Sequence, residues 1–266
     1  MLARPPPLAG EGGEGEATDS MRKRLPPPYP PPQAGEGRRC CAILTIATAL
    51  LFLAAAHAAE QRPAAFVDAS AVVPDLVVEM RYAGSHNFIA IPVDGYEKPV
   101  CLLTRPAAQA LAQVQHDLAA QKLGLKVFDC YRPARAVAHF VRWARDVRDT
   151  KAKAEFYPAV DKRDLFRLGY IAPQSGHSRG STVDISLVRL AVGAEPVELD
   201  MGTPFDTFSP RSWPSDKTVS ADARKNRALL ADAMRRHGFV RYVKEWWHFT
   251  LGNEPFPGTY FDFAVR

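Results

Sequence analysis

Residues 175–184 read SGHSRGSTVD, and in this stretch His177 and Asp184 are separated by six residues and a glycine-containing turn. Both side chains could therefore reach one metal ion. The β-branched residues from Thr182 to Val188 predict that the turn leads into a strand. Zinc takes nitrogen, sulfur or carboxylate ligands, and a catalytic zinc site uses three of them and leaves the fourth position to water. A third ligand is therefore expected elsewhere in the chain.

Residues 245–248 read EWWH and supply a candidate third ligand, His248, together with an acid, Glu245. Positions i and i+3 of a flat strand face opposite ways, so a bend at Lys244–Trp247 is required to bring both side chains to one site. Glu245 could then accept a proton from a water whose pKa the metal lowers. Taken alone, a histidine is more often a surface or hydrogen-bonded residue, and the tryptophans could be ordinary core. No site role is expected for the other histidines after residue 58: His86, His116, His139 and His237.

Apolar residues at helical spacing predict three helices. The first is capped by Thr104 and stops at Gly124, and the second follows the turn at residues 129–133. The third runs from Ser220 to His237, with Gly238 as its stop signal. On the second helix, one face is expected to carry Val137, Phe140, Val141 and Ala144.

Short segments rich in β-branched and apolar residues predict the strands. They lie at Leu125–Phe128, Thr182–Val188, Phe239–Tyr242 and His248–Leu251, whereas residues 149–176 are loop-like. Helices packed on a small, mainly antiparallel sheet make the predicted fold α+β, with the zinc site in the central cleft.

The first 58 residues differ in composition from the rest. Residues 1–37 hold nine of the 23 prolines, which predicts a disordered extension or a mis-assigned start. Residues 38–58 combine two arginines, an apolar run and Ala56-His57-Ala58, the form of a signal peptide with its cleavage site. The alternative is a membrane anchor, but the run is shorter than the roughly 20 residues that span a bilayer. The predicted domain is therefore residues 59–266, exported to the periplasm and not inserted in the membrane after cleavage.

The composition is that of a soluble globular protein, with 47% hydrophobic and 24% charged residues. The net charge of +5 is too mild to indicate a nucleic-acid partner. Cys40 and Cys41 leave with the predicted leader. The remaining cysteines, Cys101 and Cys130, could form a disulfide in an oxidising compartment or stay as buried thiols, and the sequence leaves both open.

Three motifs in this order, DCYRP at residues 129–133, SGHSRGSTVD at 175–184 and EWWHF at 245–249, resemble those of the VanX-type D-alanyl-D-alanine dipeptidases. The resemblance extends from about Val77 to Arg266 and implies hydrolysis of the D-Ala-D-Ala dipeptide with one zinc ion per chain. It implies His177, Asp184 and His248 as zinc ligands and Glu245 as the catalytic base.

The resemblance also implies that Arg132 stabilises the anionic tetrahedral intermediate, a role that suits a guanidinium in a dry site. The alternative is an arginine that caps a helix or pairs with Asp129. By the same resemblance Ser175 binds the substrate carboxylate, while Tyr82 and Asp206 lie near its free ammonium. Each of these three could equally be a surface hydroxyl or a turn residue.

The chain departs from the family at Gly176, where close relatives carry serine, and in its leader, because the best-known members are cytoplasmic. Two other functions stay open. One is a peptidoglycan D,D- or L,D-carboxypeptidase, whose pocket is open at the amino end of the substrate. The other is a non-catalytic domain that keeps zinc for structure, which an intact Glu245 and Arg132 argue against. The sequence does not indicate an oligomeric state.

Overall fold

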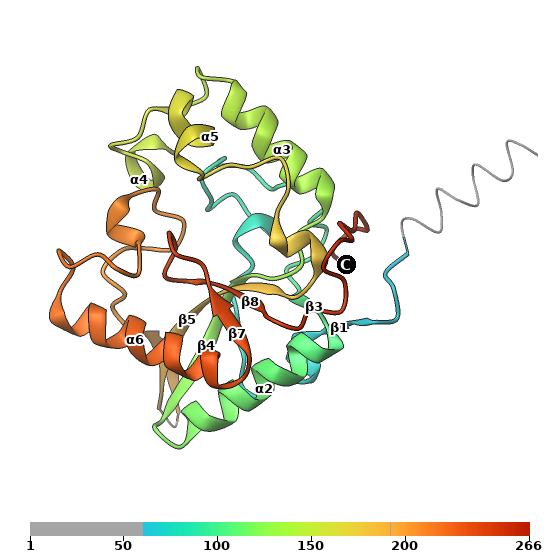
Figure 1. Ribbon diagram of the computed structural model, residues 1–266, viewed down its shortest axis with the longest axis vertical. Helices are drawn as coiled ribbons and strands as arrows, with labels where there is room; N and C mark the ends of the chain where they lie inside the picture. The colour runs from blue at the N-terminus through green and yellow to red at the C-terminus, as the bar shows by residue number, and fades with distance from the viewer. Residues whose placement is uncertain (1–60, 192) are drawn as a thin grey trace, which may run out of the picture. The chain divides into compact units, whose positions relative to one another are not determined.

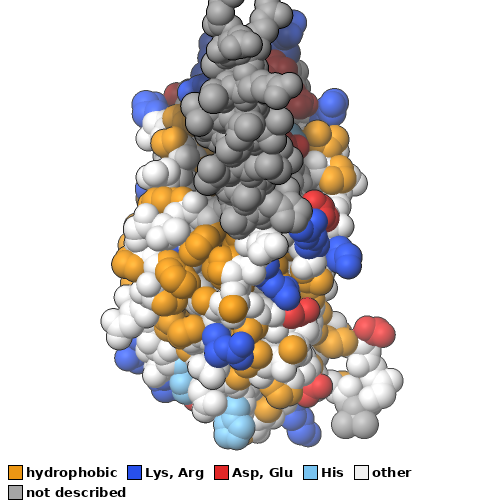
Figure 2. All heavy atoms as spheres, turned by 90° about the vertical axis from the view of Figure 1, so that its right-hand side faces the viewer, with side chains coloured by type: hydrophobic (Ala, Val, Ile, Leu, Met, Phe, Trp, Pro, Cys, Tyr) orange, Lys and Arg blue, Asp and Glu red, His pale blue; other side chains and the backbone are white. Residues whose placement is uncertain are grey.

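The computed structural model describes residues 61–191 and 193–266, so the predictions for the extension (1–37) and the leader (38–58) lie outside the described residues. Within the described part, none of the helices has the length and apolar character needed to cross a membrane. On the face shown in Figure 2, Lys and Arg side chains are dispersed among acidic and apolar ones. No basic patch is visible among the residues coloured there.

A six-stranded sheet forms the centre of the fold (Figure 1). Its strand order is β2-β4-β5-β8-β7, with β6 paired to β5, and only the β2–β4 pair is parallel. The bounds are β2 Val77–Val78, β4 Leu123–Asp129, β5 Thr182–Ala191, β6 Ala194–Glu198, β7 Phe239–Arg241 and β8 His248–Leu251. A second, two-stranded antiparallel sheet pairs β1 (Phe66–Asp68) with β3 (Leu102–Thr104). The prediction of a mainly antiparallel sheet is confirmed.

The helices lie in two groups. Helices α2 (Arg105–Ala119) and α6 (Ala221–Arg236) contact each other and the sheet, whereas α3 (Ala134–Arg145), α4 (Lys153–Phe156) and α5 (Leu165–Leu168) gather at the other end in Figure 1. This arrangement confirms the α+β class. Short 3-10 helices complete the fold: η1 Ala69–Ala71, η2 Arg81–Ala83, η3 Lys162–Asp164, η4 Gly176–Arg179 and η5 Pro210–Ser212.

The prediction for the end of the first helix was wrong. Helix α2 ends at Ala119, a turn follows in which Lys122 has φ 56°, and Gly124 already lies inside β4 opposite Val188. A Cβ on Gly124 would lie 3.1 Å from the Leu190 side chain, so this glycine permits a close approach within the sheet and is not a stop signal. Thr104 occupies the N-cap position as predicted, but its hydroxyl contacts Ser181 Oγ and makes no capping hydrogen bond.

The third helix and the last two strands agree with their predictions to within one residue. Ser220 Oγ accepts a hydrogen bond from the Ala223 backbone N–H, and Gly238 has the left-handed φ of +84° after the helix end. The sequence patterns did not predict strands β1, β2 and β3, strand β6, all of whose residues are exposed, or the short helices α4 and α5 within residues 149–176. On α3, Val141 is only partly buried, and the buried face includes Trp143.

Candidate active site

The register of three strands brings the predicted site residues together. Asp184 in β5 lies opposite Asp129 of β4 on one side and opposite His248 of β8 on the other. His177 lies in η4, just before β5. Ser175 precedes this short helix, and its Oγ accepts a hydrogen bond from the His177 backbone N–H at 3.3 Å. One turn and two cross-strand pairs thus place residues up to 71 positions apart at a single point.

His177, Asp184 and His248 form the group of three potential metal ligands that the described residues contain. Asp184 Oδ1 lies 3.2 Å from His177 Nε2 and 3.0 Å from His248 Nδ1, and the two nitrogens are 3.3 Å apart. Burial acts to raise the pKa of Asp184, but the two histidines outweigh it and lower that pKa. The carboxylate is therefore ionised, as a metal ligand must be.

The hydrogen bonds around this group fit a bound cation. His177 Nδ1 donates to the carbonyl of Cys130 at 2.7 Å, which leaves the Nε2 lone pair directed toward Asp184. Asp184 Oδ1 is buried, and although both imidazole nitrogens lie near it, no contact to it among the described residues has hydrogen-bond geometry. A buried carboxylate oxygen without a donor is costly, and a metal ion among these three atoms would satisfy it.

Glu245 lies beside the three potential ligands, and the chain bends where the sequence required it, with a turn at Val243–Lys244 and a bend at Trp246–Trp247. Its Oε2 is 3.5 Å from His248 Nδ1, and 18% of its side chain is exposed. Burial raises the pKa of Glu245 to about 7, against the opposing effect of His248. Such a pKa allows the carboxyl group both to accept and to donate a proton near neutral pH.

Arg132 follows β4 and forms the pair with Asp129 that the sequence left open as an alternative. Its Nε and Nη2 contact Asp129 Oδ2 at 2.9 and 2.8 Å, and its Nη2 also lies 3.6 Å from Asp184 Oδ2. The guanidinium carbon is 5.1 Å from the centre of the Tyr82 ring and 5.0 Å from that of Phe140. The pairing with Asp129 therefore holds the guanidinium at the site, where it still lines the pocket.

Tyr82 and Asp206 lie together although 124 positions separate them. The Tyr82 hydroxyl donates to Asp206 Oδ2 at 2.7 Å, and both residues are buried. Burial raises the pKa of Asp206 well above its usual range, and the charge of Asp184 acts in the same direction. A cationic group next to Asp206 would favour its ionised form.

A pocket of about 270 Å³ connects these groups. Apart from His177, which is fully buried behind it, every predicted site residue lines this pocket. The remaining lining is largely apolar and aromatic, with contributions from Phe88, Val137, Phe140, Ile171, Phe208 and Trp247. Charged groups thus face a small cavity with apolar surroundings, in which electrostatic interactions are stronger than in water.

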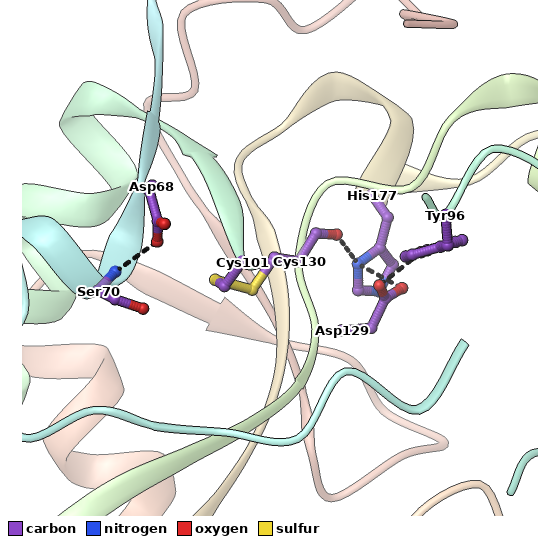
Figure 3. Close-up of a disulfide and its surroundings, with 7 residues drawn as sticks. All are labelled: Asp68, Ser70, Tyr96, Cys101, Asp129, Cys130 and His177. Carbon is purple, nitrogen blue, oxygen red and sulfur yellow. Dashed lines mark hydrogen bonds and ion pairs between the residues drawn. A yellow bond between two sulfur atoms is a disulfide. The ribbon is translucent and has the colours of Figure 1, made fainter. Parts of the chain in front are cut away.

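The contacts behind His177 were not predicted (Figure 3). Asp129 Oδ2 lies 3.5 Å from His177 Nδ1, and Asp129 Oδ1 accepts a hydrogen bond from the Tyr96 hydroxyl at 2.6 Å. Asp129 is thus a partner of both Arg132 and His177. The DCYRP motif contained the signal, but a turn aspartate and a carbonyl cannot be recognised as partners of a distant histidine without the strand register.

Cys101 and Cys130 form a disulfide, which decides between the two alternatives left open by the sequence. Figure 3 shows it on the side of the backbone at Asp129 and Cys130 that is opposite His177. Because the Cys130 carbonyl accepts the His177 hydrogen bond, the disulfide fixes a backbone group that orients a potential ligand.

Gly176, which precedes His177, lies in a crowded place. A Cβ at this position would lie 2.9 Å from Thr182 Oγ1, and that hydroxyl contacts Thr250 Oγ1 at 2.9 Å. A serine here would require the threonine to move. The other four histidines lie outside the metal group. His86 pairs with Glu155, His139 with Asp94, and both His116 and His237 with Asp117.

The fold and this site define a metal-dependent peptidase, and sequence comparison identifies its family. The peptidase family described as D-ala-D-ala dipeptidase matches residues 62–266, and the chain belongs to that family. Zinc is the metal of the family, and two imidazoles and one carboxylate are ligands that zinc favours.

Three D-alanyl-D-alanine dipeptidases illustrate the similarity. That of Enterococcus faecalis is 41% identical over 187 residues, which is 70% of this chain and 91% of the relative. That of Streptomyces coelicolor is 39% identical over 201 residues, or 76% of this chain and 97% of the relative. That of Enterococcus faecium is 38% identical over 188 residues, or 71% and 92%. The matched region therefore corresponds to nearly the whole length of each relative.

Proposed function

We propose that the chain hydrolyses D-alanyl-D-alanine to two D-alanines, with zinc held by His177, Asp184 and His248. The observation that carries this proposal is that Glu245 and Arg132 both lie next to the potential ligands. Glu245 is 3.5 Å from His248 and Arg132 is 3.6 Å from Asp184, and both line the same pocket.

Zinc, when bound, lowers the pKa of water and polarises a carbonyl group. Glu245 accepts the proton of the attacking water and passes it to the nitrogen of the leaving D-alanine. Its pKa of about 7 suits both halves of this transfer. Trp247, which is buried and lines the pocket, excludes water from the side of Glu245.

Arg132 stabilises the negative charge that develops on the carbonyl oxygen of the scissile bond. Two of its nitrogens are held by Asp129, and two aromatic rings cover the guanidinium, so it is positioned before the substrate binds. A preorganised donor in a small, partly apolar cavity costs no reorganisation during the reaction.

The two ends of the pocket account for the choice of a dipeptide. Asp206, supported by the Tyr82 hydroxyl, is assigned to the free ammonium, and Ser175 to the carboxylate. A buried carboxyl at the amino end recognises an amine and disfavours an acylated nitrogen, because the acyl group leaves Asp206 without a charged partner. This argument favours the dipeptidase over the D,D- or L,D-carboxypeptidase.

The proposed function is tested by comparing D-Ala-D-Ala with N-acetyl-D-Ala-D-Ala, with and without a chelator. A charged hydrogen bond is worth about 1.5 to 3 kcal/mol, so acetylation is expected to lower kcat/KM by about 10 to 150-fold before any steric clash. Asp206→Ala should reduce the difference in kcat/KM between the two substrates. Chelation should abolish hydrolysis of both. A preference for the acetylated substrate would instead identify a carboxypeptidase, and chelator-resistant zinc without any turnover would identify a non-catalytic domain.

Metal occupancy tests the ligand assignment. Purified protein is expected to hold one zinc per chain, and His177→Ala, Asp184→Ala and His248→Ala should each lower this occupancy, because each removes one of three protein ligands. His237→Ala is the matched control, since this histidine pairs with Asp117 outside the pocket. Elemental analysis of the folded variants gives the answer. Any variant that retains full zinc removes its residue from the ligand set.

We further propose that the enzyme is exported to the periplasm, where it acts in cell-wall peptide turnover or glycopeptide tolerance. The predicted leader at residues 38–58 supports export, and so does the disulfide, because such bonds persist in oxidising compartments. N-terminal sequencing of protein from the periplasmic fraction is expected to begin at Ala59. Soluble cytoplasmic protein that retains its leader would contradict this prediction.

A further inference from the structure

Arg227 is a buried arginine in α6, with 4% of the residue exposed. No carboxylate among the described residues forms an ion pair with it. Its guanidinium donates instead to three backbone carbonyls. Nε donates to Met201 at 2.6 Å, Nη1 to Trp213 at 3.0 Å and Nη2 to Arg211 at 3.0 Å. Asp216 and Asp200 act on its charge without forming an ion pair, so the three carbonyls satisfy the hydrogen bonds of the buried guanidinium.

The three carbonyls lie at the two ends of one segment, residues 201–213, which precedes α6 (Figure 1). Apart from η5, this segment has no helix or strand of its own. It carries Asp206 at the amino end of the pocket and Phe208 in the pocket lining. One side chain therefore joins the beginning and the end of the segment that contributes the proposed ammonium partner.

The backbone at Asp206 needs such support. Its φ is +62°, a left-handed conformation that costs free energy in residues other than glycine, although aspartate tolerates it better than most. The neighbouring Phe205 is held by stacking on Phe128 and by an edge contact with Trp247. Together with the Arg227 hydrogen bonds, these contacts hold the Asp206 carboxyl against the Tyr82 hydroxyl.

We propose that Arg227 is a positioning residue for recognition of the substrate amino group, acting through Asp206. This inference rests on the proposed function. An arginine suits this role better than a lysine because its planar fork directs several N–H groups at fixed angles, whereas an ammonium is a single point. Arg227 lines no part of the pocket and touches no reacting atom, so it acts only through the segment that carries Asp206 and Phe208.

The test compares Arg227→Met with the wild-type enzyme on D-Ala-D-Ala and N-acetyl-D-Ala-D-Ala. For the free dipeptide, KM is expected to rise by about 10-fold or more, which is the effect of losing a charged hydrogen bond to the ammonium. The acetylated substrate, which makes no such bond, should change by less than about 3-fold, and bound zinc should stay at one per chain. In an Asp206→Ala background, Arg227→Met should have no further effect on selectivity, because the two residues act in one chain of contacts.

Arg224→Met is the matched control. Arg224 lies one turn earlier on α6 and also donates to backbone carbonyls, but these belong to Lys217 and Val219, outside the 201–213 segment. It should leave the selectivity between the two substrates unchanged. If Arg227→Met does not fold, Arg227→Lys replaces it, and faster amide hydrogen exchange confined to residues 201–213 is the expected signature.

An equal loss on both substrates, an unchanged KM in a folded variant, or the same loss again in the Asp206→Ala background would overturn the proposal. Unchanged exchange of residues 201–213 in Arg227→Lys would overturn it too. Failure of the proposed function looks different, because the wild-type enzyme itself would then be inactive on D-Ala-D-Ala. In that case the exchange measurement still decides whether Arg227 holds the segment.

Discussion

Replacing Glu245 with glutamine is expected to lower kcat by about 10² to 10⁴ while zinc stays at one per chain, because general acid-base participation is worth about that factor. Glutamine keeps the size of the side chain but cannot accept a proton. Glu245 is adjacent to the potential ligand His248 without belonging to the group of three, so metal affinity should survive. Steady-state kinetics with D-Ala-D-Ala, together with elemental analysis, measure both quantities.

Glu97→Gln is the control for this change, since Glu97 is half exposed and pairs with Arg266 away from the pocket. It should leave both kcat and zinc unaltered. A Glu245→Gln enzyme with near-normal turnover would remove this residue from the proton transfer. Loss of zinc along with turnover would instead make it a ligand.

Replacing Arg132 with lysine is expected to lower kcat by about 10² to 10³, the usual cost of removing one preorganised donor to a developing anion. Lysine keeps the charge but cannot contact Asp129 with two nitrogens and face the pocket at the same time. Single-turnover kinetics separate this effect on the chemical step from an effect on binding.

Arg142→Lys provides the comparison, because Arg142 is an exposed arginine on α3 that pairs with Asp94. Arg142→Lys should leave kcat unchanged. A normal kcat with a raised KM in Arg132→Lys would assign Arg132 to substrate binding only. A large drop in thermal stability would show that its pairing with the buried Asp129 is chiefly structural, since an unpaired buried carboxylate is destabilising.

How much of the site was accessible from sequence depends on the kind of interaction. The three potential ligands and Glu245 lie in two short motifs, and the bend before His248 followed from the opposite facing of positions i and i+3. The pairing of Asp129 with Asp184 depends on strand register, which no single motif encodes. The role of Asp129 behind His177 was therefore out of reach.

The fold shows the same division. Helix α6 has a serine cap and a glycine stop, both local signals, and its bounds were predicted well. The end of α2 was misjudged because Gly124 serves a contact with Leu190, a residue 66 positions away. Strand β6 is exposed along its whole length and has no burial pattern to reveal it. Tertiary contacts, rather than local propensity, determine the structure at the end of α2 and in β6.

Because Cys101 and Cys130 form a disulfide, the redox conditions under which the protein is made affect its active site. It closes a loop of 29 residues and lies directly behind the carbonyl that orients His177. A crosslink of that span stabilises a fold by about 3 to 4 kcal/mol in the chain-entropy description. A chain synthesised where thiols stay reduced lacks this crosslink, and its Cys130 carbonyl is held by noncovalent contacts alone. The compartment of synthesis thus belongs with buffer and temperature among the conditions to be matched when two preparations of this enzyme are compared.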